Sequence, residues 1–269
     1  MGATTPRPHV GLIGFGAIGR DLSARLARDA GSLPALRQTL LLRHPSAAPL
    51  PGTSVVESLE ALIAARPALV VEAAGQAAVA EAGPALLAAG IDLLVASSGA
   101  LGEAALLARL LAAAERGGAR LIVPSGAIGG LDYLAALHGE PEARILYTSR
   151  KPVAAWREEL AAAGHDPARL AGPVTLFEGR ATDAARLYPR NLNAGLTVAL
   201  AAGAERTTVR VVADPACTEN THELTVESPL GRAEMRFANT PSPANPKTSA
   251  LTAASLAAAV RRHFATLAL

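Results

Sequence analysis

The stretch His9-Val10-Gly11-Leu12-Ile13-Gly14-Phe15-Gly16-Ala17-Ile18-Gly19 decides the fold of the first half of the chain. Its first five residues predict a buried strand, and residues 20–27 repeat apolar residues at helical spacing. Between strand and helix, Gly14 permits a tight turn, Gly16 lets a pyrophosphate approach the backbone, and Gly19 lets the helix pack closely. This pattern predicts a dinucleotide site at the helix N-terminus, with contacts from Gly14, Phe15, Gly16, Ala17 and Ile18. A purely structural turn is the alternative interpretation.

Composition bounds the class of protein. Half of the 269 residues are hydrophobic, which allows a sizeable core in one large or two ordinary domains. The formal net charge is only +2 and the basic residues are scattered, so nucleic acid is not an expected partner. The single cysteine, Cys217, excludes an intramolecular disulfide and fits a reducing compartment. With no apolar signal segment before His9, we expect a soluble cytoplasmic protein without a membrane partner or a metal site.

The residues after the second expected strand bear on the choice of cofactor. Residues 39–43 read as this strand, and in a dinucleotide-binding fold its end meets the adenosine ribose. An acid there favours NAD, whereas an arginine accommodates the 2′-phosphate of NADP. Here the strand ends in Arg43-His44 with no acid beside it, which leans toward NADP over NAD. The alternative is that Arg43 is a solvated strand end.

Strands and helices then alternate as far as residue 130, which predicts a doubly wound parallel sheet of Rossmann type. Ligands of such sheets bind outside the carboxyl ends of the strands. The ends of the strands near residues 69–72, 92–96 and 119–123 carry small residues that let a flat nicotinamide approach the backbone. Turn chemistry alone also favours glycine and serine there. The expected cofactor contacts are Ala74, Gly75, Ser97, Ser98 and Gly99.

The pattern changes near Asp132. Residues 144–149, 174–178, 207–212, 221–227 and 233–237 read as strands, most of them alternating as in a sheet with one solvated face. A helix is expected over 192–204, a proline-rich connector over 239–246 and a last helix over 249–267. We therefore expect a dinucleotide-binding domain over 1–130 and an α+β substrate domain over 131–245, with 246–269 packing back on the first.

His222 is the candidate for acid–base chemistry. It lies in a polar turn, residues 217–223, that feeds a strand of the second domain, where an imidazole with a pKa near neutrality can exchange protons. A satisfied surface histidine is the alternative. Asn191 can cap the next helix, which leaves Asn193 to bind a carboxamide or a substrate.

With these residues in view, the chain resembles the L-aspartate dehydrogenase family over nearly its whole length. The resemblance rests on the glycine turn and on six further motifs: 124–132, Lys151-Pro152, 177–181, 188–193, 220–223 and 245–249. It implies oxidation of L-aspartate to iminoaspartate, which hydrolyses to oxaloacetate and ammonia, and the reverse reductive amination. It also implies a homodimer. The family's catalytic histidine falls on His222, and its cofactor contacts fall on Ala127 and Asn193. The two carboxylates of the substrate that the resemblance implies need cationic partners, and the candidates are Lys151, Arg150, Arg190 and Lys247.

Gln76, Tyr188, Arg190 and Ala194 depart from the residues common in the family, which bears on substrate fit more than on reaction class. Two other classes of function remain alternatives. A reductase of homoserine or dihydrodipicolinate type would share the fold, and an NADP-binding sensor would bind the cofactor without turnover.

Overall fold

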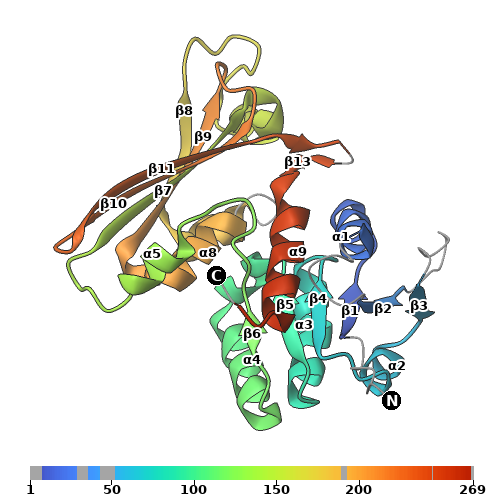
Figure 1. Cartoon of the computed structure of the whole chain (residues 1–269). Helices are drawn as coiled ribbons and strands as arrows, with labels where there is room; N and C mark the ends of the chain where they lie inside the picture. Colours follow the sequence, from blue (N-terminus) through green and yellow to red (C-terminus); the bar gives the residue numbers. More distant parts are fainter. Residues whose placement is uncertain (1–7, 29–35, 43–51, 189–192, 244, 268–269) are drawn as a thin grey trace. The chain divides into compact units, whose positions relative to one another are not determined.

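The computed structural model describes residues 8–28, 36–42, 52–188, 193–243 and 245–267, with the backbone alone at 245–247 (Figure 1). Internal contacts divide the chain into two units, residues 1–124 with 252–269, and residues 125–251. Each unit has its own sheet and is described by itself. No helix within the described ranges has both the length and the apolar character that crossing a membrane requires.

Unit 1 is built on a parallel sheet, in which the described residues form six strands in the order β3-β2-β1-β4-β5-β6. The chain runs outward from β1 in one direction and then returns to add β4 on its other side, so the order reverses between β1 and β4. This confirms the predicted doubly wound sheet. The strands are β1 His9–Ile13, β2 Arg37–Leu41, β3 Thr53–Val56, β4 Leu69–Glu72, β5 Asp92–Val95 and β6 Leu121–Ile122.

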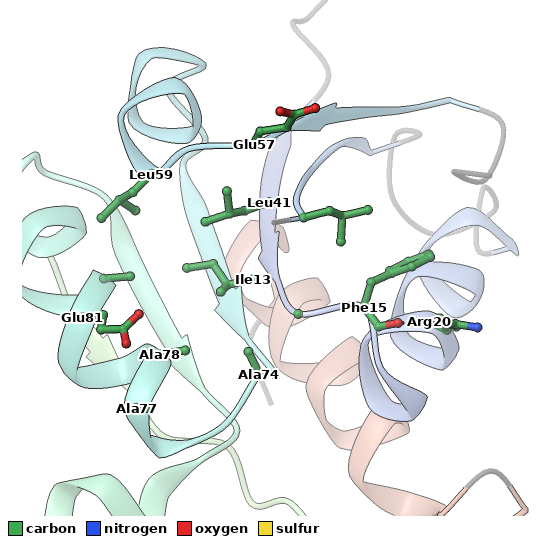
Figure 2. A pocket seen from close by; sticks show the side chains of 13 residues that line it. Ile13, Phe15, Arg20, Leu41, Glu57, Leu59, Ala74, Ala77, Ala78 and Glu81 are labelled. Atoms are coloured by element: carbon green, nitrogen blue, oxygen red, sulfur yellow. Dashed lines mark hydrogen bonds between the residues drawn. The ribbon is translucent and has the colours of Figure 1, made fainter. Parts of the chain in front are cut away.

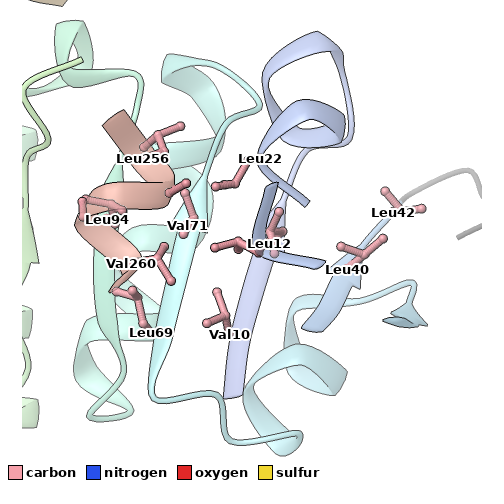
Figure 3. Packing of buried hydrophobic residues seen from close by; sticks show 13 residues of the cluster. Val10, Leu12, Leu22, Leu40, Leu42, Leu69, Val71, Leu94, Leu256 and Val260 are labelled. Atoms are coloured by element: carbon pink, nitrogen blue, oxygen red, sulfur yellow. The ribbon is translucent and has the colours of Figure 1, made fainter. Parts of the chain in front are cut away.

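The core of unit 1 joins the two ends of the sequence. Leu22 of α1 and Leu256 and Val260 of α9 are fully buried against aliphatic side chains of β1, β4 and β5 (Figure 3). Leu256 and Val260 are one helical turn apart, so a single face of α9 completes this core. The helices are α1 Ala17–Arg28, α2 Leu59–Ala64, α3 Gln76–Ala88, α4 Ala104–Gly117 and α9 Leu251–Phe264, with a 3₁₀ turn at Ser98–Gly102.

Unit 2 is built on a mixed sheet, whose described strands have the order β11-β10-β7-β9-β8. β7 and β9 are parallel, and the other neighbouring pairs are antiparallel. The strands are β7 Arg144–Pro152, β8 Val174–Arg180, β9 Thr207–Asp214, β10 Asn220–Ser228 and β11 Gly231–Asn239. The helices are α5 Leu131–Ala136, α6 Arg157–Ala162, α7 Ala181–Leu187 and α8 Asn193–Ala202, with 3₁₀ turns at Val153–Trp156 and Ala204–Arg206. The predicted α+β architecture is confirmed.

The segment expected to be a proline-rich connector, residues 239–246, contains regular strand structure. β12 Pro241–Ser242 pairs with β13 Asn245–Ser249 in a small antiparallel sheet. Proline is accepted in such an edge strand because it needs no ladder hydrogen bond on its outer side.

One face of the mixed sheet is the covered face. Tyr147, Ser149 and Lys151 alternate onto it from β7 and are buried, and His222 and Leu224 join them from β10. Helix α8 lies over this face, where a Cβ atom at Gly195 would meet Tyr147 at 3.0 Å. The opposite face carries charged pairs such as Arg210 with Glu178, as expected for a sheet solvated on one side.

Candidate active site

The glycine turn of unit 1 has the geometry that its sequence predicts. Gly14 adopts a φ of +93°, and a Cβ there would meet the backbone of Ala73. A Cβ at Gly19 would collide with the carbonyl oxygen of Gly14, so helix α1 packs directly on the turn. Gly16 has no atom within 4 Å of the place where its Cβ would lie. The turn therefore keeps open space beside Gly16 at the N-terminus of α1, which suits a phosphate.

A cavity of about 530 Å³ opens beside this turn (Figure 2). Gly14 and Phe15 line it from the turn, and Ala74 lines it after β4, so three of the predicted cofactor residues meet at one cavity. Its volume and largely apolar wall fit the adenosine half of a dinucleotide. The remaining lining residues are Ile13, Arg20, Leu41, Leu42, Glu57, Leu59, Ala77, Ala78, Glu81 and Ala82. Arg43 lies outside the described residues.

Two alanine substitutions separate folding from cofactor binding at this turn. We expect Gly16→Ala to fold normally and to bind the cofactor weakly, because its methyl group occupies the open space. We expect Gly19→Ala to lower the free energy of unfolding by about 1–3 kcal/mol, because its methyl group overlaps backbone atoms. Urea unfolding and cofactor titration of both variants check this. Equal stability of the two proteins would contradict the assigned packing.

Glu72 is a residue that the sequence reasoning missed. It is 1% exposed at the end of β4. Its carboxylate accepts hydrogen bonds from the N–H groups of Ala74 and Gly75, both at 2.7 Å, and from the N–H and hydroxyl of Ser97 at 3.1 and 3.0 Å. One buried carboxylate thus fixes two loops that carry predicted cofactor contacts. An acid at the end of a central strand, followed by small residues, was the signal in the sequence.

Removing this carboxylate should loosen both loops. We expect Glu72→Ala to lower the free energy of unfolding by about 1–3 kcal/mol, because buried donors lose their acceptor, and to weaken cofactor binding. Glu115→Ala changes an exposed glutamate of α4 and is the matched control. Urea unfolding and cofactor titration give the two values. Parental cofactor affinity in Glu72→Ala would show that the loops hold their shape without it.

In unit 2, the loop that carries Ala127 is tied to β11. The side-chain amide of Asn239 donates a hydrogen bond of 2.7 Å to the carbonyl oxygen of Ala127. Gly129 lies against the ring of Phe237, where a Cβ would approach to 3.0 Å. Phe237 pairs with His222 across β10 and β11. Ala127 is therefore held at the edge strand next to the one that carries His222.

His222 does not lie in an exposed turn. It is the third residue of β10, it is 5% exposed, and it faces Ser149 of β7. Its Nδ1 lies 2.7 Å from the Tyr147 hydroxyl. Burial, and then the charge of Lys151, lower the pKa of His222 to about 3. The expectation of a pKa near neutrality is therefore wrong. Of the expected turn over 217–223, only residues 217–219 lie outside the strand, and β10 carries the imidazole inside.

Lys151 is the cation that the fold brings to His222. Its side chain is 3% exposed, and its Nζ lies 5.3 Å from the centre of the Trp156 ring. Arg150, one residue earlier, points to the opposite face of β7. There its guanidinium binds Asp214 at 2.9 Å and Glu223 at 3.1 Å. Of these two neighbouring candidates, Lys151 alone lies on the covered face.

The other predicted residues are placed as follows. Asn193 is the first residue of α8, two positions before the Gly195 that touches Tyr147. Gly75 precedes α3, and Ser97, Ser98 and Gly99 follow β5. Ala17 and Ile18 begin α1. Arg190 and the side chain of Lys247 lie outside the described residues.

The buried imidazoles predict a loss of stability in acid. The pKa of His222 is lowered in the fold, and burial also lowers the pKa values of His9 and His263. Unfolded histidine has a pKa of about 6.5, so the unfolded chain takes up these protons first as pH falls. This contribution to stability is complete above about pH 6.5 and is lost below it. Between about pH 8 and about pH 5, urea unfolding should show a smaller loss in the free energy of unfolding for His222→Gln than for the parent. Equal losses would contradict burial of a neutral His222.

Comparison with known proteins decides the family. A sequence model described as "Aspartate dehydrogenase, C-terminal" matches residues 132–263. L-aspartate dehydrogenase 2 of Bordetella pertussis is 50% identical over 261 residues, which cover 96% of this chain and 97% of that protein. The chain belongs to the L-aspartate dehydrogenase family. L-aspartate dehydrogenase of Ruegeria pomeroyi is 40% identical over 262 residues, covering 97% of this chain and 94% of that protein.

The fold agrees with this family. The crystal structure of aspartate dehydrogenase from Thermotoga maritima matches with a TM-score of 0.75 and 26% identity, covering 98% of this chain and 99% of that one. A second sequence model, described as "Homoserine dehydrogenase, NAD binding domain", matches residues 14–124. This L-aspartate dehydrogenase family member is therefore an oxidoreductase that acts on CH–NH₂ groups and uses a nicotinamide dinucleotide.

Proposed function

We propose that this chain catalyses the reversible oxidation of L-aspartate to iminoaspartate, which water converts to oxaloacetate and ammonia. The observation that carries the proposal is the buried pair of His222 and Lys151 on the covered face of a chain that belongs to this family. An imidazole can exchange protons with water and ammonia, and an ammonium can bind a carboxylate of the substrate.

We propose cofactor-binding residues in each of the two units. Gly14, Phe15, Gly16, Ala17 and Ile18 would hold the phosphates, and Ala74, Gly75, Ser97, Ser98, Gly99, Ala127 and Asn193 complete the proposed set. When bound, the nicotinamide supplies the hydride acceptor. The protein holds, orients and shields the reacting groups, which is a large part of catalysis of this kind.

His222 is the proposed catalytic residue. Its Nε2 takes a proton from the water that attacks the imine carbon. In the reverse direction, after ammonia has added to oxaloacetate, it returns that proton to the hydroxyl that leaves the adduct as water. Burial and the Lys151 charge depress the pKa of His222 in the absence of substrate. A dicarboxylate bound at Lys151 offsets that positive charge and raises the pKa, so His222 becomes a stronger base once the substrate is in place.

Lys151 is the proposed partner of one substrate carboxylate, and Arg190 and Lys247 are the proposed partners of the other. The support for Lys151 is its burial beside His222. The support for Arg190 and Lys247 is their place in motifs of the resemblance.

We propose that NADP is used in preference to NAD. Arg43 follows the second strand in the sequence, and Arg20 adds a positive charge at the cavity, both of which suit a 2′-phosphate. Glu57 and Glu81 line the same cavity and oppose this preference, because a carboxylate repels a phosphate. We further propose a cytoplasmic homodimer. The free thiol of Cys217 suits a reducing compartment, and light scattering tests the dimer.

The substrate proposal is tested by following reduction of NADP⁺ and of NAD⁺ at the nicotinamide absorbance. L-aspartate, L-glutamate and L-homoserine are supplied separately. We expect turnover with L-aspartate, with a higher kcat/KM for NADP⁺. Turnover with L-homoserine in place of L-aspartate would reject the substrate. A higher kcat/KM for NAD⁺ would reject only the nucleotide preference.

A further inference from the structure

Tyr147 is a fully buried phenol in direct contact with the proposed catalytic imidazole. It is 0% exposed, and its hydroxyl lies 2.7 Å from Nδ1 of His222. The two rings are stacked, with centres 5.9 Å apart and planes 20° from parallel. Gly195 of α8 gives the phenol room, since any side chain there would press on its ring. Tyr147 therefore fixes the plane of the imidazole and occupies Nδ1, which leaves Nε2 as the nitrogen available to a substrate.

Ser149 stands beside this contact. It is 0% exposed, it pairs directly with His222 across β7 and β10, and it shares the covered face with Tyr147. Its hydroxyl has no hydrogen bond of regular geometry among the described residues. It nevertheless lies close enough to Tyr147 to oppose, in part, the rise that burial causes in the pKa of the phenol. A buried hydroxyl without a regular hydrogen-bond partner lowers the stability of the fold, so we expect this hydroxyl to have a functional role.

The two hydroxyls decide which ring nitrogen of His222 can act as a base. A neutral imidazole carries one proton, so Nε2 can accept a proton only while Nδ1 carries one. An Nδ1–H group in this buried place needs an acceptor, and the oxygen of Tyr147 is at hydrogen-bond distance. The phenol must then donate its own hydrogen elsewhere. Ser149 Oγ is the neighbouring hydroxyl that can accept it.

We propose that Tyr147 is a positioning residue for His222 and that Ser149 accepts the Tyr147 hydrogen whenever Nδ1 carries a proton. This inference rests on the proposed role of His222. The chain Nδ1–H to Tyr147 to Ser149 keeps the lone pair of Nε2 directed at the substrate. After Nε2 takes the proton of the attacking water, the same two hydrogen bonds support the imidazolium. No proton passes along these hydroxyls in this step, because Nδ1 keeps its proton and both hydrogen bonds keep their direction.

In the described part of the chain, few charged groups surround His222, so the effect of the two hydroxyls can be measured separately from the effect of charge. Among the described residues, Lys151 and Tyr147 of β7 are the titratable groups that interact with it. On β11 the uncharged Phe237 pairs with His222, and Gly195 of α8 lies against Tyr147. A change at Tyr147 or Ser149 therefore acts on the hydrogen bonding of His222 and leaves the neighbouring charge of Lys151 in place.

The variants Tyr147→Phe and Ser149→Ala test the proposal, and Tyr133→Phe, in helix α5, is the matched control. We expect Tyr147→Phe to lower kcat by about 10- to 100-fold, the range in which partners of functional histidines act, with unchanged cofactor affinity and little change in KM. The acidic limb of its kcat–pH profile should move to lower pH, since the imidazolium loses a supporting acceptor. Ser149→Ala should show the same shift with a smaller loss. Nitrogen NMR of labelled histidine should show less Nδ1–H tautomer of His222 in both variants.

Parental kcat and pH profile in Tyr147→Phe, in a protein whose His222→Ala variant is inactive, would overturn this inference and leave the proposed function standing. Retained activity in His222→Ala would overturn both. If Tyr147→Phe does not fold, Ser149→Ala decides the question by the same pH profile and NMR signals, because it removes a single buried hydroxyl.

Discussion

Replacing His222 by alanine is expected to lower kcat by about 100- to 10,000-fold, the range associated with loss of a general acid–base group. The imidazole is buried on the covered face beside Tyr147 and Lys151, so solvent water cannot take its place in the same geometry. The readout is the steady-state kcat for L-aspartate oxidation, together with cofactor affinity from fluorescence titration. Cofactor affinity should stay at the parental value, because His222 does not line the cavity beside the glycine turn.

His165→Ala is the matched control, since His165 is exposed in the connection after α6. It should keep the parental kcat. A His222→Ala enzyme with near-parental kcat would remove His222 from the chemistry. A loss of secondary structure in that variant would be visible by circular dichroism, and His222→Gln then repeats the test with an uncharged side chain of similar reach.

Replacing Lys151 by methionine is expected to raise KM for L-aspartate by about 10- to 100-fold, because a charge-assisted hydrogen bond to a carboxylate is worth about 1.5–3 kcal/mol. Methionine keeps the length of the buried stem and its packing against Trp156, so the change removes mainly the charge. The same substitution removes the positive charge that lowers the pKa of His222. The pKa of the imidazole in the substrate-free protein should therefore rise.

Lys151→Arg separates charge from shape. It keeps the positive charge but replaces a compact ammonium by a planar fork, so it should restore the low pKa of His222 and only part of the substrate affinity. Steady-state kinetics and a histidine NMR titration give the two values. An unchanged KM in Lys151→Met would assign the substrate carboxylates to other cations, with Arg190 and Lys247 as the remaining candidates.

The sequence was sufficient for the fold class because its signals are local. The strand and glycine turn around Gly14 and the alternation of strands and helices to residue 130 predict the parallel sheet, and that sheet is present. Elements that lack a strong period escaped prediction. β3 and α2 are four and six residues long, and α5, α6 and α7 have six or seven residues, too few for a helical period to stand out.

The candidate site was only partly visible in the sequence. His222 was singled out by its residue type, but its burial and its low pKa depend on β7, which is far from it in the chain. Spacing alone gave no reason to pair it with Tyr147, because the contact arises from strand register. Glu72 was missed for the same reason, since its partner Ser97 lies in the loop after the neighbouring strand β5. Arg150 looked equivalent to Lys151 until alternation placed the two on opposite faces.

The most direct test of the central claim is ammonium-dependent oxidation of NADPH in the presence of oxaloacetate, followed at the nicotinamide absorbance. The account predicts turnover that requires both oxaloacetate and ammonium, is weaker with NADH, and is absent with 2-oxoglutarate. Turnover of oxaloacetate without ammonium would contradict it, because that result describes a hydroxy-acid dehydrogenase in which no C–N bond is formed.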